Sequence, residues 1–280
     1  LAAALCSGCS TAPFKITDSF ASYYAKNKEE VGSDLKGMAS DLAVLSDSEA
    51  TDPNYQSNDY ADLLINDSTN EVLESYHCFD RLYPASITKV MTALLTLEHG
   101  NMDDEITLKH DINLTENGAV ISTLTKGDTV TVGQVFHTML IKSANDCAVI
   151  LAEYVAGSES KFIDMMNAKA KELGATHTHF VNPNGLHDNN HYTTAYDLYL
   201  IFKEAVKYDT FVDTVSSKDY TMTYTTPKKT QINEYMQSTN YYLLNEFPVP
   251  EGVVMYGGKT GTTSMAKSCL ILMTKNKKGE

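Results

Sequence analysis

The stretch from Tyr83 to Gly100 places a serine and a lysine in the first turn of an apolar helix. Apolar side chains recur there at spacings of three and four residues: Ile87, Val90, Met91, Leu94 and Leu97. This periodicity predicts a helix with a buried face, which begins after Pro84 and ends at Gly100. Ser86 and Lys89 share one side of its first turn. A hydroxyl beside an amine that can take its proton, near backbone N–H groups that favour negative charge, has the parts of an activated nucleophile.

The serine–lysine pair alone is weak evidence, because Ser-x-x-Lys occurs four times, beginning at Ser33, Ser86, Ser158 and Ser264. The Ser33 copy lies in a polar segment, and the Ser158 copy serves the start of a predicted amphipathic helix over residues 158–173. Only the Ser86 copy follows a predicted hairpin, starts a buried helix and precedes two further motifs. The serine–lysine pair therefore indicates a site only together with those motifs.

The first of them, Ser143-Ala144-Asn145, lies between two predicted helices, Val132 to Ile141 and Cys147 to Val155. We expect Ser143 and Asn145 to lie on the loop between these helices, where polar side chains can point into a cleft. A simpler interpretation is that Asn145 or Asp146 only caps the second helix.

The second motif, Lys259-Thr260-Gly261, occurs once and falls within a predicted strand from Gly252 to Thr263. Glycines in a strand let another backbone or a ligand approach closely. The next predicted strand runs from Ser268 to Thr274, so the motif lies at the start of a predicted antiparallel pair.

The rest of the chain predicts alternating helical and extended segments. Period-two and period-3.6 patterns and turn residues place them as follows: hairpin strands Tyr60 to Ile65 and Glu71 to Tyr76, short strands and turns over 101–131, a helix from Thr193 to Lys207, and a hairpin within Asp219 to Asn240.

The three motifs stand in order along the chain, separated by 57 residues (143 − 86) and by 116 residues (259 − 143). In this order and setting the chain resembles serine-type D-alanyl-D-alanine carboxypeptidases, the low-molecular-mass penicillin-binding proteins. The resemblance runs from about Tyr60 to the end. The segments that carry it are Pro84-Ala85-Ser86-Ile87-Thr88-Lys89, Ser143-Ala144-Asn145-Asp146, Phe180-Val181-Asn182-Pro183-Asn184-Gly185-Leu186 and Gly258-Lys259-Thr260-Gly261-Thr262. It implies an α+β fold of the β-lactamase/transpeptidase type: an antiparallel sheet flanked by helices, an all-helical lobe, and an active site between them.

The resemblance also implies a chemistry for the first pair. Ser86 would be the nucleophile that cleaves a D-Ala-D-Ala terminus of a peptidoglycan stem peptide through an acyl-enzyme, and β-lactams would acylate it. Lys89 would be its base, which must be neutral to act. Because a free lysine has a pKa near 10.4, burial and the like charge of Lys259 must lower the pKa of Lys89.

The other implied site residues bind or orient the substrate. Ser143 would relay a proton toward the leaving D-alanine, and Asn145 would hold the substrate amide and the Lys89 amine. Lys259 and Thr260 would bind the terminal carboxylate, within the strand motif that Gly261 completes. Backbone N–H groups of Ser86 and Thr262 are expected to form the oxyanion hole, where one lost donor costs on the order of 3 kcal/mol.

The composition of the chain limits the kinds of ligand and macromolecule that it is expected to bind. The formal net charge of −14 and the absence of a basic patch argue against nucleic acid. His187 and His191 have metal-like spacing, but the residues between them are typical of a loop and no third ligand cluster accompanies them. We therefore expect neither a metal nor a cofactor. Cys78, Cys147 and Cys269 are scattered and predict no disulfide framework.

The N-terminal residues predict export. The first ten resemble the end of a secretion signal, and Ser7-Gly8-Cys9 resembles a lipoprotein cleavage box that would place a lipid on Cys9. An ordinary trimmed signal explains them equally. We interpret residues 1–55 as a signal remnant and tether, with one weak helix near Glu29 to Leu45, and residues 56–280 as the enzyme domain at the extracytoplasmic face of the membrane or in the cell wall. The resemblance leads us to expect that the C-terminal end is truncated, with a final strand and helix missing.

Three alternatives use the same fold. A class A β-lactamase needs a glutamate in a Glu-x-x-Leu-Asn pattern after the second motif, and Asn182-Pro183-Asn184-Gly185-Leu186 offers none. A D,D-endopeptidase or transpeptidase would use the same site residues and remains open. A non-catalytic module that binds β-lactams or the cell wall is the third, although every motif residue is present.

Overall fold

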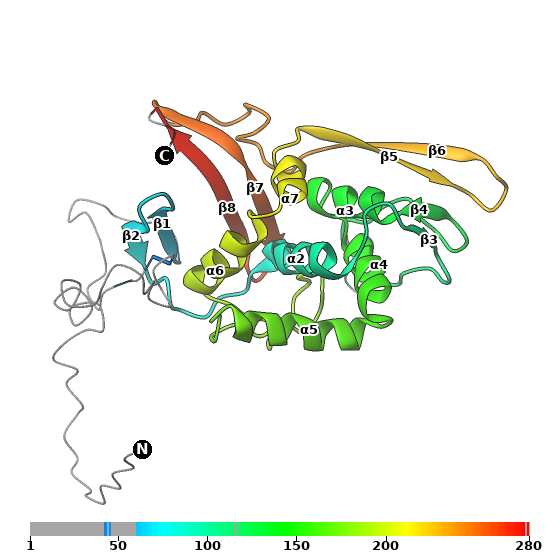
Figure 1. Cartoon of the computed structure of the whole chain (residues 1–280), viewed down its shortest axis with the longest axis horizontal. Helices are drawn as coiled ribbons and strands as arrows, with labels where there is room; N and C mark the ends of the chain where they lie inside the picture. Colours follow the sequence, from blue (N-terminus) through cyan, green and yellow to red (C-terminus); the bar gives the residue numbers. More distant parts are fainter. Residues whose placement is uncertain are drawn as a thin grey trace, which may run out of the picture. The chain divides into compact units, whose positions relative to one another are not determined.

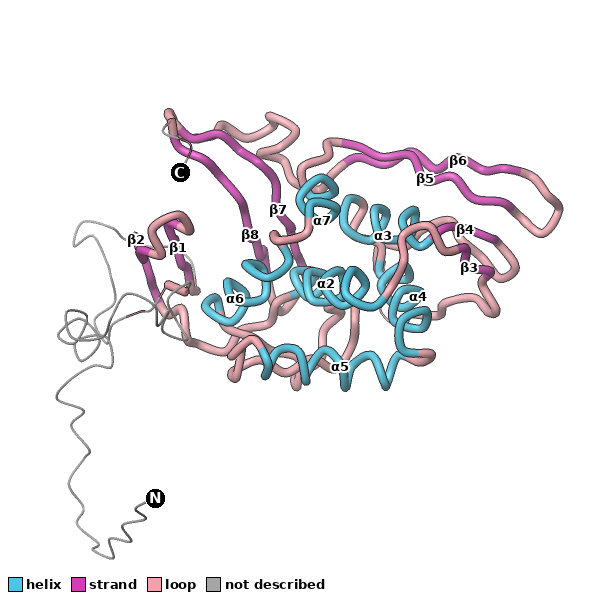
Figure 2. Tube along the Cα trace, in the orientation of Figure 1, coloured by secondary structure: helices cyan, strands magenta, loops and turns pink. Residues whose placement is uncertain are grey.

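Figure 1 and Figure 2 show the computed structural model of the chain, which describes residues 42, 43, 45, 60–114, 116, 118–277 and 279. The predicted tether, its weak helix and Ser33 motif, the lipidation residue Cys9 and the domain boundary after residue 55 lie outside the described residues, apart from the three isolated positions. Among the described residues, no helix combines the length and apolar character needed to cross a membrane.

The chain divides into two compact units. The described residues of the first unit are 42, 43, 45 and 64–76, and those of the second are 60–63 and the described residues from His77 on. Strands β1 (Asp62–Asn66) and β2 (Glu71–Tyr76), which are mostly in the first unit, form a two-stranded sheet. The side chain of Asn66 accepts a hydrogen bond from the Ser68 N–H in the connecting turn, at 3.1 Å. The predicted hairpin is confirmed.

Helix α2 (Lys89–His99) contacts four other helices of the second unit. It follows a short 3₁₀ helix, η1 (Ala85–Thr88), and its residues from Lys89 to Thr96 are all buried. A helix that is buried all round belongs at the centre of a domain. Its neighbours are α3 (Val132–Ile141), α4 (Asn145–Ala156), α5 (Glu159–Glu172) and α6 (Ala195–Ala205).

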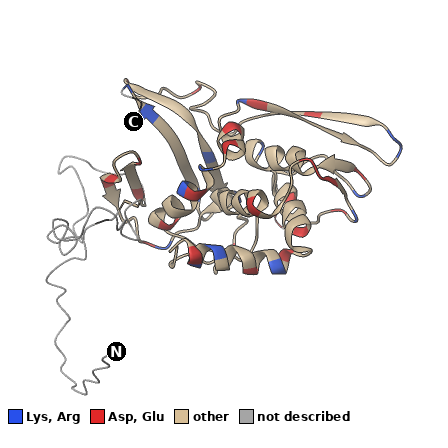
Figure 3. Ribbon diagram, in the orientation of Figure 1, with Lys and Arg blue, Asp and Glu red and all other residues tan. Residues whose placement is uncertain are grey.

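The outer helices begin at side-chain caps. The hydroxyl oxygens of Thr131, Ser158 and Thr194 accept hydrogen bonds from backbone N–H groups at the starts of α3, α5 and α6. The Ser158 copy of Ser-x-x-Lys is therefore a helix cap. Acidic and basic side chains follow one another along α5, whose outer face carries charge of both signs (Figure 3). A further helix, α7 (Asp209–Val215), was not predicted.

Two antiparallel sheets complete the second unit within its described residues. Strands β3 (Glu105–Thr107), β4 (Thr129–Thr131), β5 (Asp219–Thr225) and β6 (Gln231–Gln237) pair in that order, and β7 (Val253–Thr263) pairs with β8 (Lys267–Asn276). Both predicted C-terminal strands and the 219–240 hairpin are confirmed, as is the α+β class. Ser86 lies in η1, directly before α2, and because η1 contacts both β7 and β8, this segment lies against the strand that carries Lys259.

Candidate active site

The backbone around Ser86 is held by an unusually close approach of another segment. Ala85, directly before the serine, has a φ of 47°, which a residue with a side chain adopts rarely. A Cβ added to Gly185 would lie 1.9 Å from the Ala85 carbonyl oxygen, so only glycine fits opposite it. The loop that carries Gly185 therefore packs directly on η1, the segment that carries Ser86.

Lys89 reaches three partners with one buried amine. Its Nζ lies 2.9 Å from Ser86 Oγ, 2.8 Å from Asn145 Oδ1 and 2.6 Å from the Asn184 carbonyl oxygen. The residue is 0% exposed. The structure thus brings together three of the predicted site residues, Ser86, Lys89 and Asn145, and adds a backbone carbonyl that the sequence analysis did not assign.

The partners of Lys89 determine where its proton-accepting lone pair points. Asn145 Nδ2 donates to the Val120 carbonyl oxygen at 3.0 Å, so Asn145 Oδ1 faces Lys89 as an acceptor. The Asn184 carbonyl can only accept. A neutral amine has two hydrogens, and these two acceptors take both. Its lone pair is then left for the Ser86 hydroxyl, which can donate its proton to Nζ.

The surroundings favour the neutral amine. Burial lowers the pKa of Lys89 well below its ordinary value, and the positive charge of Lys259 lowers the pKa further. Asp146 and Cys147 act in the opposite direction with weaker effect. Burial and the charge of Lys259 are the two causes expected from the sequence, and burial is the larger of them.

Lys259 is the second buried amine, 1% exposed, on β7. Its Nζ donates to Ser143 Oγ at 2.9 Å and to the Thr260 carbonyl oxygen at 2.8 Å. Burial lowers the pKa of Lys259 to about 7. Ser143 has a φ of 64° in the turn before α4, which directs this serine toward Lys259 in an uncommon backbone conformation. The second and third motifs therefore meet through Ser143 and Lys259.

The remaining residues of the third motif lie along the same strand. Thr260 Oγ1 lies 2.5 Å from Thr239 Oγ1, a hydroxyl that the sequence analysis did not assign. A Cβ added to Gly261 would lie 2.9 Å from the Ser86 backbone nitrogen, so β7 approaches the backbone of Ser86 closely. Thr262 follows on the strand and is exposed. The two predicted oxyanion donors, the N–H groups of Ser86 and Thr262, thus belong to adjoining segments.

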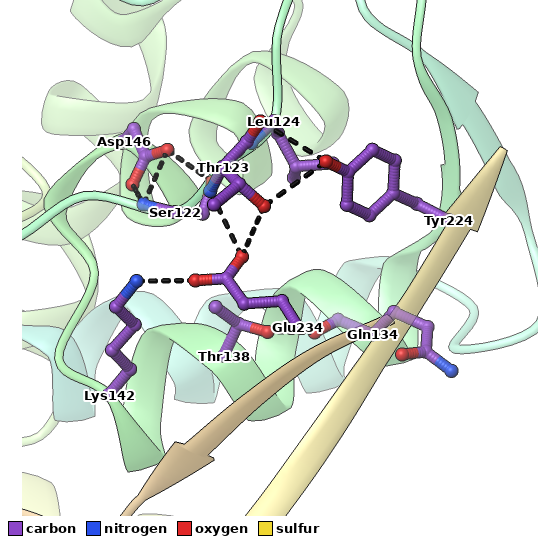
Figure 4. Close-up of polar contacts among 9 residues, drawn as sticks. All are labelled: Ser122, Thr123, Leu124, Gln134, Thr138, Lys142, Asp146, Tyr224 and Glu234. Carbon is purple, nitrogen blue, oxygen red and sulfur yellow. Dashed lines mark hydrogen bonds and ion pairs between the residues drawn. The ribbon is translucent and has the colours of Figure 1, made fainter. Parts of the chain in front are cut away.

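One detail of the second motif differs from expectation. Asn145 is the first residue of α4, so only Ser143 lies on the loop. The helix is preceded by Ala144 and has no side-chain cap, so the capping interpretation of Asn145 and Asp146 is wrong. Asp146 instead accepts hydrogen bonds from the N–H and hydroxyl groups of Ser122, as Figure 4 shows. The hydrophobic periodicity predicted that α4 begins at Cys147, two residues after its observed start at Asn145.

The two histidines with metal-like spacing in the sequence, His187 and His191, have different neighbours in the structure. Among the described residues, no group of three or more His, Cys, Asp or Glu side chains is placed to hold a metal ion. His191 is buried against η1, with Nε2 at 2.8 Å from Thr88 Oγ1. Because the Thr88 hydroxyl donates to the Ala85 carbonyl at 2.8 Å, it accepts from His191 Nε2–H. His191 Nδ1 then accepts from the Val181 N–H at 3.2 Å, which requires the neutral ring.

This arrangement predicts acid sensitivity. Burial lowers the pKa of His191 to about 4, against about 6.5 in an unfolded chain. Between these values the unfolded chain binds more protons, so stability falls as the pH falls from 6.5 to 4, by about 3 kcal/mol in total from this group. We expect His191→Gln, which keeps a neutral donor and acceptor, to flatten that part of the curve of unfolding free energy against pH. Denaturant unfolding at several pH values measures it, and an unchanged acid slope would contradict the assignment.

The chain is similar to known proteins in both sequence and structure. The Peptidase S11 family, described as D-alanyl-D-alanine carboxypeptidase, matches residues 47–280. The chain is 35% identical over 217 residues to D-alanyl-D-alanine carboxypeptidase DacF of Bacillus subtilis, covering 76% of this chain and 53% of the relative. It is 32% identical over 213 residues to DacC of Escherichia coli, covering 73% of this chain and 50% of the relative. The chain therefore spans about half the length of these curated relatives.

A solved structure supports the same fold. The crystal structure of the Streptomyces K15 DD-transpeptidase superposes with a TM-score of 0.67 and 29% identity, covering 75% of this chain and 83% of that one. The β-lactamase/transpeptidase type of fold expected from the sequence is confirmed.

Proposed function

The chain belongs to the D-alanyl-D-alanine carboxypeptidase family, and on that premise we propose that it removes the terminal D-alanine from peptidoglycan stem peptides through an acyl-enzyme on Ser86. One observation carries the proposal: the buried Lys89 amine lies within hydrogen-bond distance of two carbonyl oxygens and of Ser86 Oγ. In the neutral amine the two oxygens take both hydrogens and the lone pair is left for Ser86, so the amine can act as a general base.

The first half-reaction forms an ester. Ser86 Oγ attacks the carbonyl carbon of the penultimate D-alanine while its proton moves to Lys89 Nζ. The N–H groups of Ser86 and Thr262 stabilise the negative charge that develops on the carbonyl oxygen. The C–N bond to the last residue then breaks, and the proton held by Lys89 passes through Ser143 to the leaving nitrogen, so D-alanine departs with a neutral amino group and Lys89 is neutral again.

The third motif suits the other end of the substrate. Lys259, with a pKa of about 7, becomes fully charged when a carboxylate approaches, and Thr260 can donate to the same carboxylate. Asn145 can hold the substrate amide while its Oδ1 keeps Lys89 in place. In the second half-reaction, water gives a proton to Lys89 as it adds to the ester carbonyl, and when the ester bond to Ser86 breaks, Lys89 passes this proton to the Ser86 oxygen.

The acceptor in the second half-reaction separates this activity from its alternatives. An amine in place of water would give transpeptidation, and a cross-linked peptide as donor would give endopeptidase action. The Streptomyces K15 neighbour, which is named a DD-transpeptidase, keeps the first of these as a second candidate. β-Lactams are proposed to acylate the same serine, because they present a reactive carbonyl beside a carboxylate.

Peptidoglycan as substrate places the enzyme outside the cytoplasm, and the family acts on that polymer. We add that the chain is secreted and that Cys9 carries a lipid anchor. Ser7-Gly8-Cys9, after a run of small and apolar residues, supports this. Intact mass of protein extracted from membranes tests it, and an unmodified N-terminal region would refute the anchor. The enzyme domain is proposed to be residues 56–280.

The function is tested by adding benzylpenicillin and a peptide that ends in D-Ala-D-Ala. The wild-type protein is expected to gain the mass of one penicillin molecule, on the peptide that contains Ser86, and to release D-alanine without forming peptide dimers. Ser86→Ala should do neither while keeping its thermal unfolding temperature. Dimer formation in the presence of an amine acceptor would favour transpeptidation. A folded wild-type protein that penicillin does not label would refute the proposal.

A further inference from the structure

A carboxylate on the β5–β6 hairpin makes contacts that the proposed reaction does not use. Glu234 lies on β6 opposite Met222, and its side chain is 10% exposed. Its Oε2 accepts from the Thr123 N–H at 3.0 Å and from Thr123 Oγ1 at 2.6 Å. Its Oε1 forms an ion pair with Lys142 (Figure 4). One side chain thus joins a loop, a helix end and a strand that are far apart in the sequence.

The loop that Glu234 holds supports Asn145. Three residues before Thr123, the Val120 carbonyl oxygen accepts from both the backbone N–H of Asn145, at 2.8 Å, and its side-chain Nδ2, at 3.0 Å. Ser122, between them, donates its N–H and its hydroxyl to Asp146, the next residue of α4. The orientation of the Asn145 amide, and with it the contact to Lys89, depends on this loop.

The helix end that Glu234 holds supports Ser143. Lys142, the ion-pair partner of Glu234, directly precedes Ser143 in the chain. The ion pair therefore restrains the backbone on the N-terminal side of Ser143, which has a positive φ. The N–H of Lys142 donates to the Thr138 carbonyl oxygen at 3.1 Å, so Lys142 is the C-cap of α3 and the ion pair anchors this end of the helix. Both ends of the Ser143–Asn145 segment are therefore tied to the same carboxylate.

We propose that Glu234 is a positioning residue for the acylation of Ser86, because it holds the loop and the helix end that orient Asn145 and Ser143. The inference rests on the proposed function for its kinetic consequence. The carboxylate suits this role because it stays charged at neutral pH. Burial by itself would raise the pKa of Glu234, but hydrogen bonds from Lys142 and Thr123 outweigh it and lower the pKa. Charge-assisted hydrogen bonds are stronger and shorter than neutral ones.

A second contact between the β5–β6 hairpin and the loop allows Glu234 to be replaced without detaching the loop. The Tyr224 hydroxyl lies 3.1 Å from Thr123 Oγ1 and 3.3 Å from the Thr123 carbonyl oxygen. Since Thr123 Oγ1 donates to Glu234, it accepts from Tyr224. This contact, drawn in Figure 4, remains when Glu234 is replaced, so the loop stays attached and the variant is expected to fold.

The experiment measures the rate of acylation by a fluorescent penicillin in Glu234→Ala, Glu234→Gln and a matched control. Asn233→Ala is the control, because Asn233 Oδ1 accepts from Thr223 Oγ1 at 2.9 Å within the same hairpin, and neighbouring residues of a strand such as Asn233 and Glu234 point to opposite faces. We expect Glu234→Ala to acylate on the order of tenfold to a hundredfold more slowly. Glu234→Gln, which keeps an acceptor for Thr123, should recover part of the rate, and Asn233→Ala should match the wild type.

A double-mutant cycle distinguishes positioning from a general loss of stability. Because Asn145 is one of the two residues that Glu234 orients, replacing Glu234 in an Asn145→Ala background should slow acylation by a clearly smaller factor than in the wild-type background. Equal slowing in both backgrounds, a wild-type rate in Glu234→Ala, or equal slowing in Asn233→Ala would each overturn the inference.

Hydrogen exchange separates this inference from the proposed function. The Asn145 N–H, bonded to Val120, should exchange at least about tenfold faster in Glu234→Ala than in Asn233→Ala or wild type. If the wild-type protein is not acylated at all, the proposed function fails, and unchanged exchange at Asn145 would then reject the positioning role on its own.

Discussion

Lys89→Met is expected to slow the acylation of Ser86 by about a thousandfold while the protein stays folded. Methionine is close to lysine in length and fills the same buried space, but it has no lone pair on nitrogen to take the serine proton. General-base catalysis typically contributes between about 10²-fold and 10⁴-fold to a rate. The nucleophile, the backbone donors and Lys259 all remain in this variant, so the loss reports the amine alone.

Stability should change little in Lys89→Met, because two effects oppose each other. The Asn184 and Asn145 oxygens lose a donor, at about 1–3 kcal/mol for each buried acceptor left unpaired. Removing a fully buried amine whose pKa is lowered by burial offsets this cost. The measurement is the rate of mass gain with benzylpenicillin, with thermal unfolding as the folding check and Ser86→Ala as the zero of the assay.

The pH profile of the same reaction adds a sharper criterion. In the wild type, acylation should fall on the acid side as Lys89 takes up a proton and can no longer accept one from Ser86. Lys89→Met should show no such acid limb in its residual rate. A variant that is folded and acylates within about tenfold of the wild type would show that another group is the base.

Gly185→Ala is expected to abolish acylation and to destabilise the fold by about 2–4 kcal/mol. The added Cβ would lie 1.9 Å from the Ala85 carbonyl oxygen and 2.9 Å from Thr88 Oγ1, and the φ of 84° is itself unfavourable for alanine. The obstruction is backbone, which cannot rotate away. The loop must therefore move, and with it the Asn184 carbonyl that takes one Lys89 hydrogen.

A matched glycine separates the clash from the backbone strain. Gly157, just after α4, has a similar φ of 75°, but an added Cβ meets no atom within 4 Å. Gly157→Ala should cost only about 1 kcal/mol from its φ and should acylate at the wild-type rate. Denaturant unfolding and the penicillin assay on both variants measure the difference. Equal behaviour of the two would contradict a tight contact between Gly185 and Ala85.

Helices and strands could be predicted from the sequence where the apolar residues of a segment follow one clear helical or strand periodicity. The helix 132–141 was predicted with its observed bounds, and the two C-terminal strands were predicted with every end within two residues of its observed position. Helix α7 was missed because its seven residues give too short a window for helical periodicity. Asn145 was placed on a loop because the polar run before α4 hid the true helix start. The pattern of side-chain types therefore predicted which segments form helices and strands, whereas the residues at which they begin and end depend on tertiary packing.

The sequence by itself determined the chemical inventory: a serine and a lysine one turn apart, a serine and an asparagine near a helix start, and a lysine on a glycine-rich strand, in that order. Only the tertiary structure decided how these groups act. Burial of Lys89, the dominant cause of its lowered pKa, depends on how completely helices and strands close over it. The Asn184 carbonyl is a backbone group, which every residue has, so no side-chain pattern marks it. The contact of Glu234 with Thr123 joins positions 111 residues apart, and such pairings follow from the packed fold alone.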